Sequence, residues 1–290
     1  MVDFKLHSLG NFSNDEIRSW MDSSARIAAQ KMNIDEMEFE RLVKEQYKEI
    51  DERAKFPTIE INTEEREALR NQIIADYFNE FSGAKKENTA IIVLGQIASG
   101  KSTFCKSLLE NDHAFVVDSD FIKQGYGSMR GLKDDFDNGK GTTQVHEEAS
   151  MLSKKIISLA SEYGYNLVIP KTGVNYNSIE NIVKNLKSKN YYVGMAYVDL
   201  PIKKCIQRNY DRYLNEMLSG SPSRLIPFED IKAIDDNPFK TFARFLMNRD
   251  GLVNDFVAFS NDVGSGEAMK QISTEEIIQF VIENQLTFSW

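Results

Sequence analysis

From residue 89 onward, short apolar runs alternate with longer amphipathic segments. The apolar runs predict buried strands at 90–94 (AIIVL), 114–118 (AFVVD), 165–169 (YNLVI) and 191–198 (YYVGMAYV). Segments with helical periodicity occupy the intervals near 101–110, 143–162 and 176–188. Parallel strands need crossover connections of this length, and the crossovers are usually helices. The pattern therefore predicts an α/β fold, a parallel sheet flanked by helices.

Before residue 89 the pattern is helical throughout. Helix-start signals pair Ser13 with Glu16, Asn33 with Glu36, and Asn62 with Glu65. One face of the third predicted helix carries Arg66, Leu69, Ile73, Tyr77 and Phe81. The polar segment 82–88 (SGAKKEN) predicts a linker. We therefore predict an all-helical N-terminal region over 1–88 and an α/β domain over 89–290.

Composition narrows the class of protein. The chain has 290 residues, of which 41% are apolar, as in soluble globular proteins. Its 44 acidic and 35 basic residues give a net charge of −9, which argues against a nucleic-acid partner. Cys105 and Cys205 stand alone, without the spacing of a disulfide framework or a zinc site. No secretory signal pattern or membrane-length apolar stretch is visible, so we expect a cytoplasmic protein without membrane contact.

The strongest chemical signal is segment 95–102 (GQIASGKS), which satisfies G-x-x-x-x-G-K-[ST] between a predicted strand and a predicted helix. Backbone N–H groups of such a loop point at phosphate oxygens. The Lys101 ammonium is expected to reach the terminal phosphates, and the Ser102 hydroxyl to ligate Mg²⁺. We therefore predict that ATP or GTP is bound with Mg²⁺ by Gly95, Gln96, Ile97, Ala98, Ser99, Gly100, Lys101, Ser102 and Thr103.

A kinase also needs a base that takes a proton from the acceptor hydroxyl. Asp118 and Asp120 follow the second predicted strand, at an end that faces the ligand crevice of a parallel sheet. One acid suffices as the base, and the other can cap the next helix. Both could also be simple helix-start acids. A motor or GTPase would instead need a Walker B acid, for which Asp199 is the nearest candidate.

Cations must also stabilise the transferred phosphoryl group. A helix and the following loop supply candidates at Arg208, Arg212 and Arg224. The alternative is a solvated helix face, above all for Arg208. His146, Glu147 and Glu148 suit the first turn of a helix, and a lone histidine there is more often structural than catalytic.

With these features in this order, residues from about 90 to 260 resemble the zeta-toxin kinases, the toxins of epsilon/zeta toxin–antitoxin systems. The resemblance rests on GQIASGKST, VVDSDFIK, GYNLVIPKTG, LPIKKCIQRNYDRY, SRLIP and FVAFSND. It implies a P-loop kinase in which Lys101 and Ser102 serve ATP and Mg²⁺, Asp120 is the general base, and Arg212 and Arg224 contact phosphates. It also implies an acceptor side with Asp118, Thr172 and Glu148.

Members of this family phosphorylate a sugar or ribose hydroxyl, notably the 3′-hydroxyl of UDP-N-acetylglucosamine. The resemblance is weaker on the acceptor side. Pro170 and Lys171 precede the T-G turn where an acidic residue is expected, and Val174 stands where an arginine is expected. Lys154 stands where a glutamate is expected, unless Glu147 or Glu148 takes that role.

These departures leave the ATP side intact and the acceptor open. The acceptor would be a nucleotide sugar, with UDP-N-acetylglucosamine first, or a dinucleotide such as NAD. A 5′-hydroxyl polynucleotide kinase shares the loop and the acids. A kinase-derived interaction protein would bind ATP without turnover and act through residues 1–88. The resemblance also implies regulation, by a separate antitoxin or in cis by residues 1–88.

Overall fold

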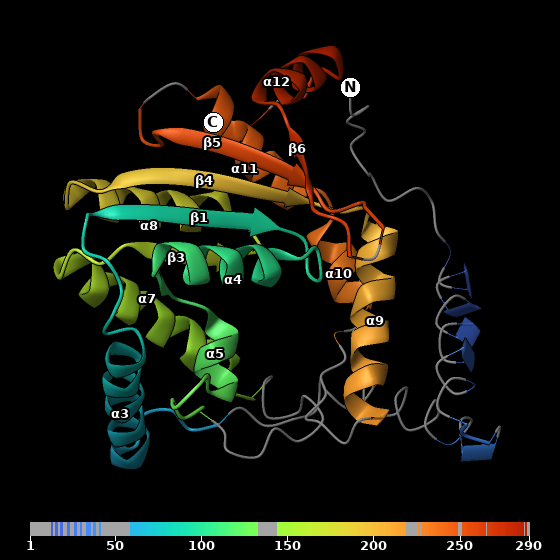
Figure 1. The fold of residues 1–290 in the computed structure, drawn as a ribbon, viewed down its shortest axis with the longest axis horizontal. Helices are drawn as coiled ribbons and strands as arrows, with labels where there is room; N and C mark the ends of the chain where they lie inside the picture. The colour runs from blue at the N-terminus through green and yellow to red at the C-terminus, as the bar shows by residue number, and fades with distance from the viewer. Residues whose placement is uncertain are drawn as a thin grey trace.

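The computed structural model describes residues 59–132, 144–218, 226, 228–248, 251–264, 266–286 and 288, and separate positions between 13 and 41. Within these residues, six strands form one sheet in the order β2-β3-β1-β4-β5-β6 (Figure 1). Five are mutually parallel: β1 Thr89–Gly95, β2 Phe115–Val116, β3 Leu167–Lys171, β4 Tyr192–Asp199 and β5 Asp255–Ser260. The sixth, β6 Lys270–Ile272, is antiparallel to β5. The predicted α/β fold with a parallel sheet is confirmed.

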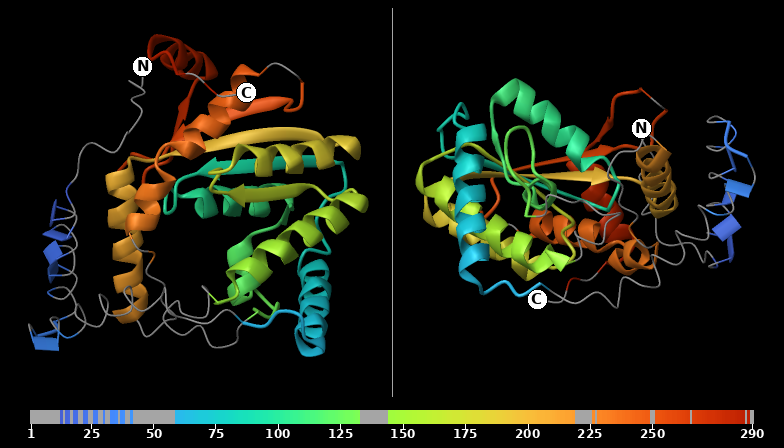
Figure 2. Two further views of the ribbon diagram at one scale, coloured as in Figure 1. Left: turned by 180° about the vertical axis from the view of Figure 1, so that it is seen from behind. Right: turned by 90° about the horizontal axis from the view of Figure 1, so that it is seen from below.

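Helices cover both faces of the sheet. Helix α4 packs against β1, β2 and β3 on one face, and α7, α8 and α11 lie on the other (Figure 2, right). The helices are α3 Glu64–Glu80, α4 Lys101–Asp112, α5 Ser119–Gln124, α7 His146–Glu162, α8 Tyr176–Ser188, α9 Ile202–Leu218, α10 Phe228–Ile234, α11 Asn237–Met247 and α12 Thr274–Glu283. The predicted crossover helices correspond to α4, α7 and α8. Helices α10, α11 and α12 and strand β6 were not predicted.

Helix α3 packs into the same core as the sheet. Ile73 and Tyr77 are fully buried and Phe81 nearly so, which confirms the predicted apolar face. The Phe81 ring lies 5.1 Å, centroid to centroid, from that of Phe115 in β2. The helix begins after Thr63, one residue later than expected, because the Thr63 hydroxyl accepts the Arg66 N–H. The core of the α/β domain therefore includes side chains that precede residue 89.

The predicted linker 82–88 hydrogen-bonds to two other segments. The Lys85 N–H donates to the His113 carbonyl at 3.0 Å, and the Lys85 carbonyl accepts from the Asn166 N–H at 2.7 Å. Asn166 also bonds through its side-chain oxygen to the N–H of Glu87 at 2.9 Å. These bonds fix the path from α3 into β1 across the amino ends of the neighbouring strands.

The first two predicted helices fall mostly outside the described residues. At the first start signal, the Ser13 hydroxyl accepts the Glu16 N–H, and the Glu16 carboxylate accepts the Ser13 N–H, as predicted. The second start signal was wrong by two residues. Asn33 has a left-handed φ of 56°, and the Asp35 carboxylate accepts the Glu38 N–H instead. Among the described residues, no helix is both long and apolar enough to cross a bilayer.

Candidate active site

A cleft of about 940 Å³ opens at the carboxyl ends of the parallel strands. Figure 1 shows β1 and β4 pointing toward this end, where α9 and α10 lie. Ligands of open α/β sheets bind at this edge, and the volume suits a nucleotide together with a second substrate. The lining includes Ile97, Ala98, Ser99, Gly100, Lys101, Ser102, Thr103, Asp118, Asp120, Lys123, His146, Ser150, Pro170, Lys171, Thr172, Arg208, Arg212, Asp230 and Asn261.

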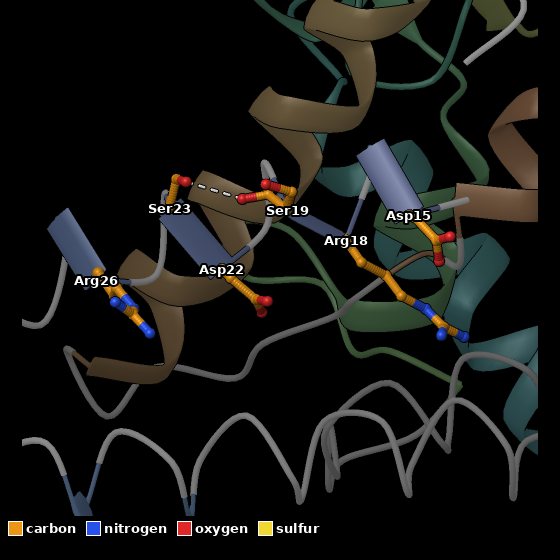
Figure 3. Close-up of a pocket in the computed structure, with 6 residues that line it drawn as sticks. All are labelled: Asp15, Arg18, Ser19, Asp22, Ser23 and Arg26. Atoms are coloured by element: carbon orange, nitrogen blue, oxygen red, sulfur yellow. Dashed lines mark hydrogen bonds between the residues drawn. The ribbon is translucent and has the colours of Figure 1, made fainter. Parts of the chain in front are cut away.

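A second hollow of about 400 Å³ lies along residues 15–26 (Figure 3). The described residues that line it all belong to that segment: Asp15, Arg18, Ser19, Asp22, Ser23 and Arg26. All six side chains are exposed, and the one hydrogen bond drawn runs from the Ser23 hydroxyl to the Ser19 carbonyl at 2.8 Å. The described lining therefore supplies exposed polar side chains and no apolar wall, unlike the usual small-molecule site.

The phosphate loop has a backbone that only glycine allows at two positions. Gly100 precedes α4 with φ 102°, and a Cβ there would lie 2.2 Å from the Asn261 amide nitrogen. That amide nitrogen donates to the Ser99 carbonyl at 2.7 Å. At Gly95, a Cβ would lie 2.6 Å from the Val198 carbonyl oxygen. The loop is therefore held against the ends of β4 and β5, with its N–H groups at the amino end of α4.

The loop's polar groups fit an anion. The Lys101 ammonium donates to the carbonyls of Gly95 at 2.9 Å and Gln96 at 2.7 Å, and burial lowers the pKa of Lys101. The Ser99 hydroxyl is buried, and no described residue accepts or donates a hydrogen bond to it. Phosphate oxygens would satisfy both groups and face the positive end of the helix dipole. The residues present therefore fit a nucleotide phosphate at this loop.

The two acids after β2 have different environments. Asp118 caps α5 through its carboxylate, which accepts the Asp120 N–H at 2.9 Å. Burial, and then the nearby charge of Asp120, raise the pKa of Asp118. Asp120 has a side chain that is 41% exposed and forms an ion pair with Lys123 at 3.2 Å. The capping role foreseen for one acid belongs to Asp118, and both acids line the cleft.

A second part of the cleft is formed by the end of β3, the strand next to β1, and by the start of α7. The Lys171 ammonium donates to the Ser153 hydroxyl at 3.0 Å. Burial lowers the pKa of Lys171, and the charge of Asp118 opposes this effect. Thr172 follows in the turn and lines the cleft, as predicted from the resemblance, and His146 and Ser150 line it from α7. We call this surface, after the predicted acceptor side, the acceptor wall: Asp118, Asp120, Lys123, Lys171 and Thr172, with His146 and Ser150.

Glu148, expected on the acceptor side, does not line the cleft. Its carboxylate is fully buried and forms ion pairs with two arginines of α3. Arg70 Nη1 lies 2.9 Å from Glu148 Oε1, and Arg66 Nε donates to the same oxygen at 3.3 Å. The expectation is corrected for a physical reason: a buried carboxylate needs charge partners, and α3 supplies them on the side away from the cleft.

Two of the three predicted arginines line the cleft. Arg208 donates to the Asn261 carbonyl at 3.0 Å, so it also anchors the segment after β5. Arg212 lies one turn further along α9, where Nη2 is 3.4 Å from the Asn209 side-chain oxygen and Nε is 3.9 Å from the Glu216 carboxylate. Arg224 lies outside the described residues.

Ser102, Asp118 and Asp120 are the oxygen donors suited to Mg²⁺ beside the phosphate loop. In the part of the chain that the structure describes, no three His, Cys, Asp or Glu side chains form a metal cluster. A phosphate-bound Mg²⁺ needs only one or two protein ligands, because phosphates and water supply the rest. Asp199, the Walker B candidate, is buried, accepts the Tyr197 hydroxyl at 3.1 Å and does not line the cleft.

Sequence reasoning missed Lys123 and Asn261, and it foresaw neither the charge that Lys171 brings to the cleft nor the contacts of the Gln96 amide. Lys123 and Lys171 charge the acceptor wall. Asn261 holds the phosphate loop, and the Gln96 amide joins that loop to the carbonyls of Ile231 and Asp235 at 3.1 Å each. Of the two missed residues, Asn261 had a sequence signal, because it lies in FVAFSND, one of the segments that carry the family resemblance.

Cys105 and Cys205 are free and buried, and burial raises the pKa of each thiol to about 12. A thiol with so high a pKa is a poor nucleophile at neutral pH.

Known proteins that resemble this chain in sequence are zeta toxins. Residues 75–261 match the zeta toxin family. Toxin zeta of Enterococcus hirae is 26% identical over 151 residues, which are 50% of this chain and 52% of that protein. Toxin zeta of Streptococcus pyogenes is 26% identical over 132 residues, 45% of this chain and 46% of that protein. The chain thus spans about half the length of the curated relatives it matches.

A solved structure shares the fold. It comes from a study of the PezAT chromosomal toxin–antitoxin system of Streptococcus pneumoniae, with a TM-score of 0.51 at 15% identity. The match covers 74% of this chain and 94% of that one.

Proposed function

The chain belongs to the zeta toxin family, and from this premise we propose that it is a kinase that transfers the γ-phosphate of ATP to a hydroxyl group of a small molecule. The observation that carries the proposal is a single cleft, in which a phosphate loop faces two strand-end acids and two arginines. A protein that only bound nucleotide would need the loop but not the acids or the second wall.

In the proposed reaction Asp120 accepts the proton of the acceptor hydroxyl. Asp120 is the more suitable of the two acids, because Asp118 is buried and used as a helix cap. Lys101 would exchange its loop carbonyls for phosphate oxygens, and Arg208 and Arg212 would stabilise the charge on the moving phosphoryl group. Mg²⁺ held by Ser102 would add charge neutralisation there.

We propose a nucleotide-linked sugar or a ribose hydroxyl as the acceptor, with UDP-N-acetylglucosamine as the first candidate and NAD as the second. The cleft has room beyond the phosphate loop, and its acceptor wall carries both acids and lysines that can hydrogen-bond sugar hydroxyls and phosphates. A polynucleotide acceptor is less well supported, because the net charge is −9.

We also propose that the protein is regulated, by an antitoxin partner or in cis by its own N-terminal region. The support is the toxin–antitoxin context of the PezAT neighbour, together with the long segment that precedes the family match. Because α3 belongs to the core, the in-cis proposal is confined to residues before 59.

The chemical proposal is tested by replacing Asp120 with Asn, which keeps the shape of the side chain and removes its charge. ATP affinity should change little, and transfer should fall by about 10²- to 10⁴-fold, the usual contribution of a positioned general base. Single-turnover transfer and ATP titration on the same preparation measure both. Asp255→Asn, at the amino end of β5, is the matched control and should transfer at the wild-type rate. Near-normal transfer by the Asp120→Asn variant would exclude Asp120 as the general base.

A further inference from the structure

The hydroxyl of Tyr77 in α3 hydrogen-bonds to the backbone of Asp118. It donates to the Asp118 carbonyl at 3.2 Å and accepts the Asp118 N–H at 3.3 Å. At Asp118 the chain leaves the sheet, since the last ladder bond of this segment runs from the Val117 N–H to the Val168 carbonyl. A side chain of α3 therefore supplies the partner that a neighbouring strand would otherwise provide.

The Tyr77 side chain is itself rigidly held. Its exposure is 0%, and its ring packs against Phe81 and Phe115 with centroid distances of 5.5 Å and 5.9 Å. Burial raises the pKa of the Tyr77 hydroxyl well above its ordinary value, so it remains a neutral donor at physiological pH. A fixed, protonated hydroxyl defines the position of the Asp118 backbone.

The position of Asp118 in turn determines that of Asp120. The Asp118 carboxylate accepts the Asp120 N–H at 2.9 Å, so the cap connects the two acids directly. Helix α3 also reaches the opposite part of the acceptor wall. Arg66 and Arg70 bind Glu148 in the first turn of α7, the helix from which His146 and Ser150 line the cleft. Figure 1 shows α3 standing beside α5 and α7.

We propose that Tyr77 is a positioning residue for phosphoryl transfer: through the backbone of Asp118 it aims the Asp120 carboxylate at the acceptor hydroxyl. The inference rests on the proposed function. Tyr77 does not line the cleft, so its effect belongs to the alignment of the acceptor and the base, not to ATP binding. Misalignment of a reacting group by about 1 Å can cost as much as about 10²-fold in rate.

The test compares Tyr77→Phe with Tyr191→Phe. Tyr191 is also buried, and its hydroxyl also donates to a backbone carbonyl, that of Tyr165 at 2.8 Å, but it lies just before β4 at the amino end of the sheet. Both variants lose the same chemical group, so both should lower the melting temperature by a similar amount. Only Tyr77→Phe should lower the single-turnover rate, by about 10-fold, with ATP affinity within about twofold of wild type.

Two results would overturn the inference: a Tyr77→Phe variant that transfers at the wild-type rate, or a Tyr191→Phe variant that loses as much rate as Tyr77→Phe. The second result would mean that the rate follows stability alone. Absence of transfer by the wild-type protein is a different outcome, because it contradicts the proposed kinase function and removes the inference with it.

Discussion

The two sides of the cleft are built in different ways. The phosphate side is centred on one contiguous segment, the loop 95–102, whose geometry follows from its glycines and from the helix that begins at Lys101. The acceptor wall is assembled from the ends of β2 and β3 and the start of α7, and α3 supports it from behind through Tyr77, Arg66 and Arg70. A contiguous loop can keep its function while its surroundings change, whereas an assembled wall changes with each element that forms it. This difference agrees with the sequence resemblance, which is close at the phosphate loop and weaker at Pro170, Lys171 and Val174.

The largest effect is expected from damage to the phosphate side. Lys101→Ala removes the cation that the loop holds, so it should weaken ATP binding and slow transfer together, lowering kcat/KM by about 10³-fold. Lys106→Ala is the matched control, because Lys106 lies exposed on the same helix and does not line the cleft. Steady-state kinetics with an ATP titration measure both parameters. A loss confined to rate, with normal ATP affinity, would contradict the assignment of Lys101 to the ground-state nucleotide.

Substitution of Arg212 in α9 should have a smaller effect, and one confined mainly to the transfer rate. Arg212→Ala should lower the transfer rate by about 10- to 10²-fold and leave ATP affinity nearly unchanged, since its charge would act mainly on the transition state. The rate is measured at saturating ATP. Lys204 lies on the same helix, pairs with Asp262 after β5 and does not line the cleft, so Lys204→Ala is the control variant. Equal losses in affinity and rate would place Arg212 on the ground-state phosphates instead.

The N-terminal region offers a test of regulation that leaves both sides of the cleft intact. Deletion of residues 1–58 keeps α3, its arginines and Tyr77, and should raise transfer several-fold if the removed segment inhibits in cis. Activity of the truncated and full-length proteins is compared at equal concentrations. A folded truncated protein with unchanged activity would exclude inhibition in cis.

The two sides of the cleft also differ in how well the sequence predicts them. The phosphate loop is local, so its residues, strand and helix could be recognised together. Glu148 was misplaced because its partners Arg66 and Arg70 lie 82 and 78 residues away in sequence, and no local pattern shows that pairing. The hydrogen bond from Tyr77 to Asp118 could not be predicted either. The periodicity of a helix predicts that Tyr77 is buried, but not which backbone group its hydroxyl contacts.

The smallest predicted effect concerns stability. The folded-state pKa of Asp118 lies above its ordinary value, so folding favours the protonated form. The contribution of Asp118 to the free energy of unfolding is therefore fully present at low pH. It is lost as the pH rises past the ordinary carboxyl range. Asp118→Asn keeps the helix cap and removes the charge, so it should melt slightly above wild type at neutral pH and show no such advantage near pH 3. Melting temperatures across this pH range measure the difference, and a variant that is less stable at neutral pH would contradict the assignment.

The central claim is that the cleft transfers phosphate to a small molecule, and labelled ATP tests it most directly. The wild-type protein is incubated with γ-labelled ATP, Mg²⁺ and separate acceptors: UDP-N-acetylglucosamine, NAD, a metabolite extract, and DNA and RNA with free 5′-hydroxyl ends. We expect label on a nucleotide sugar, a dinucleotide or another small-molecule hydroxyl, and loss of that label with Asp120→Asn. Label on nucleic-acid ends alone, or ATP binding with no labelled acceptor, would contradict it.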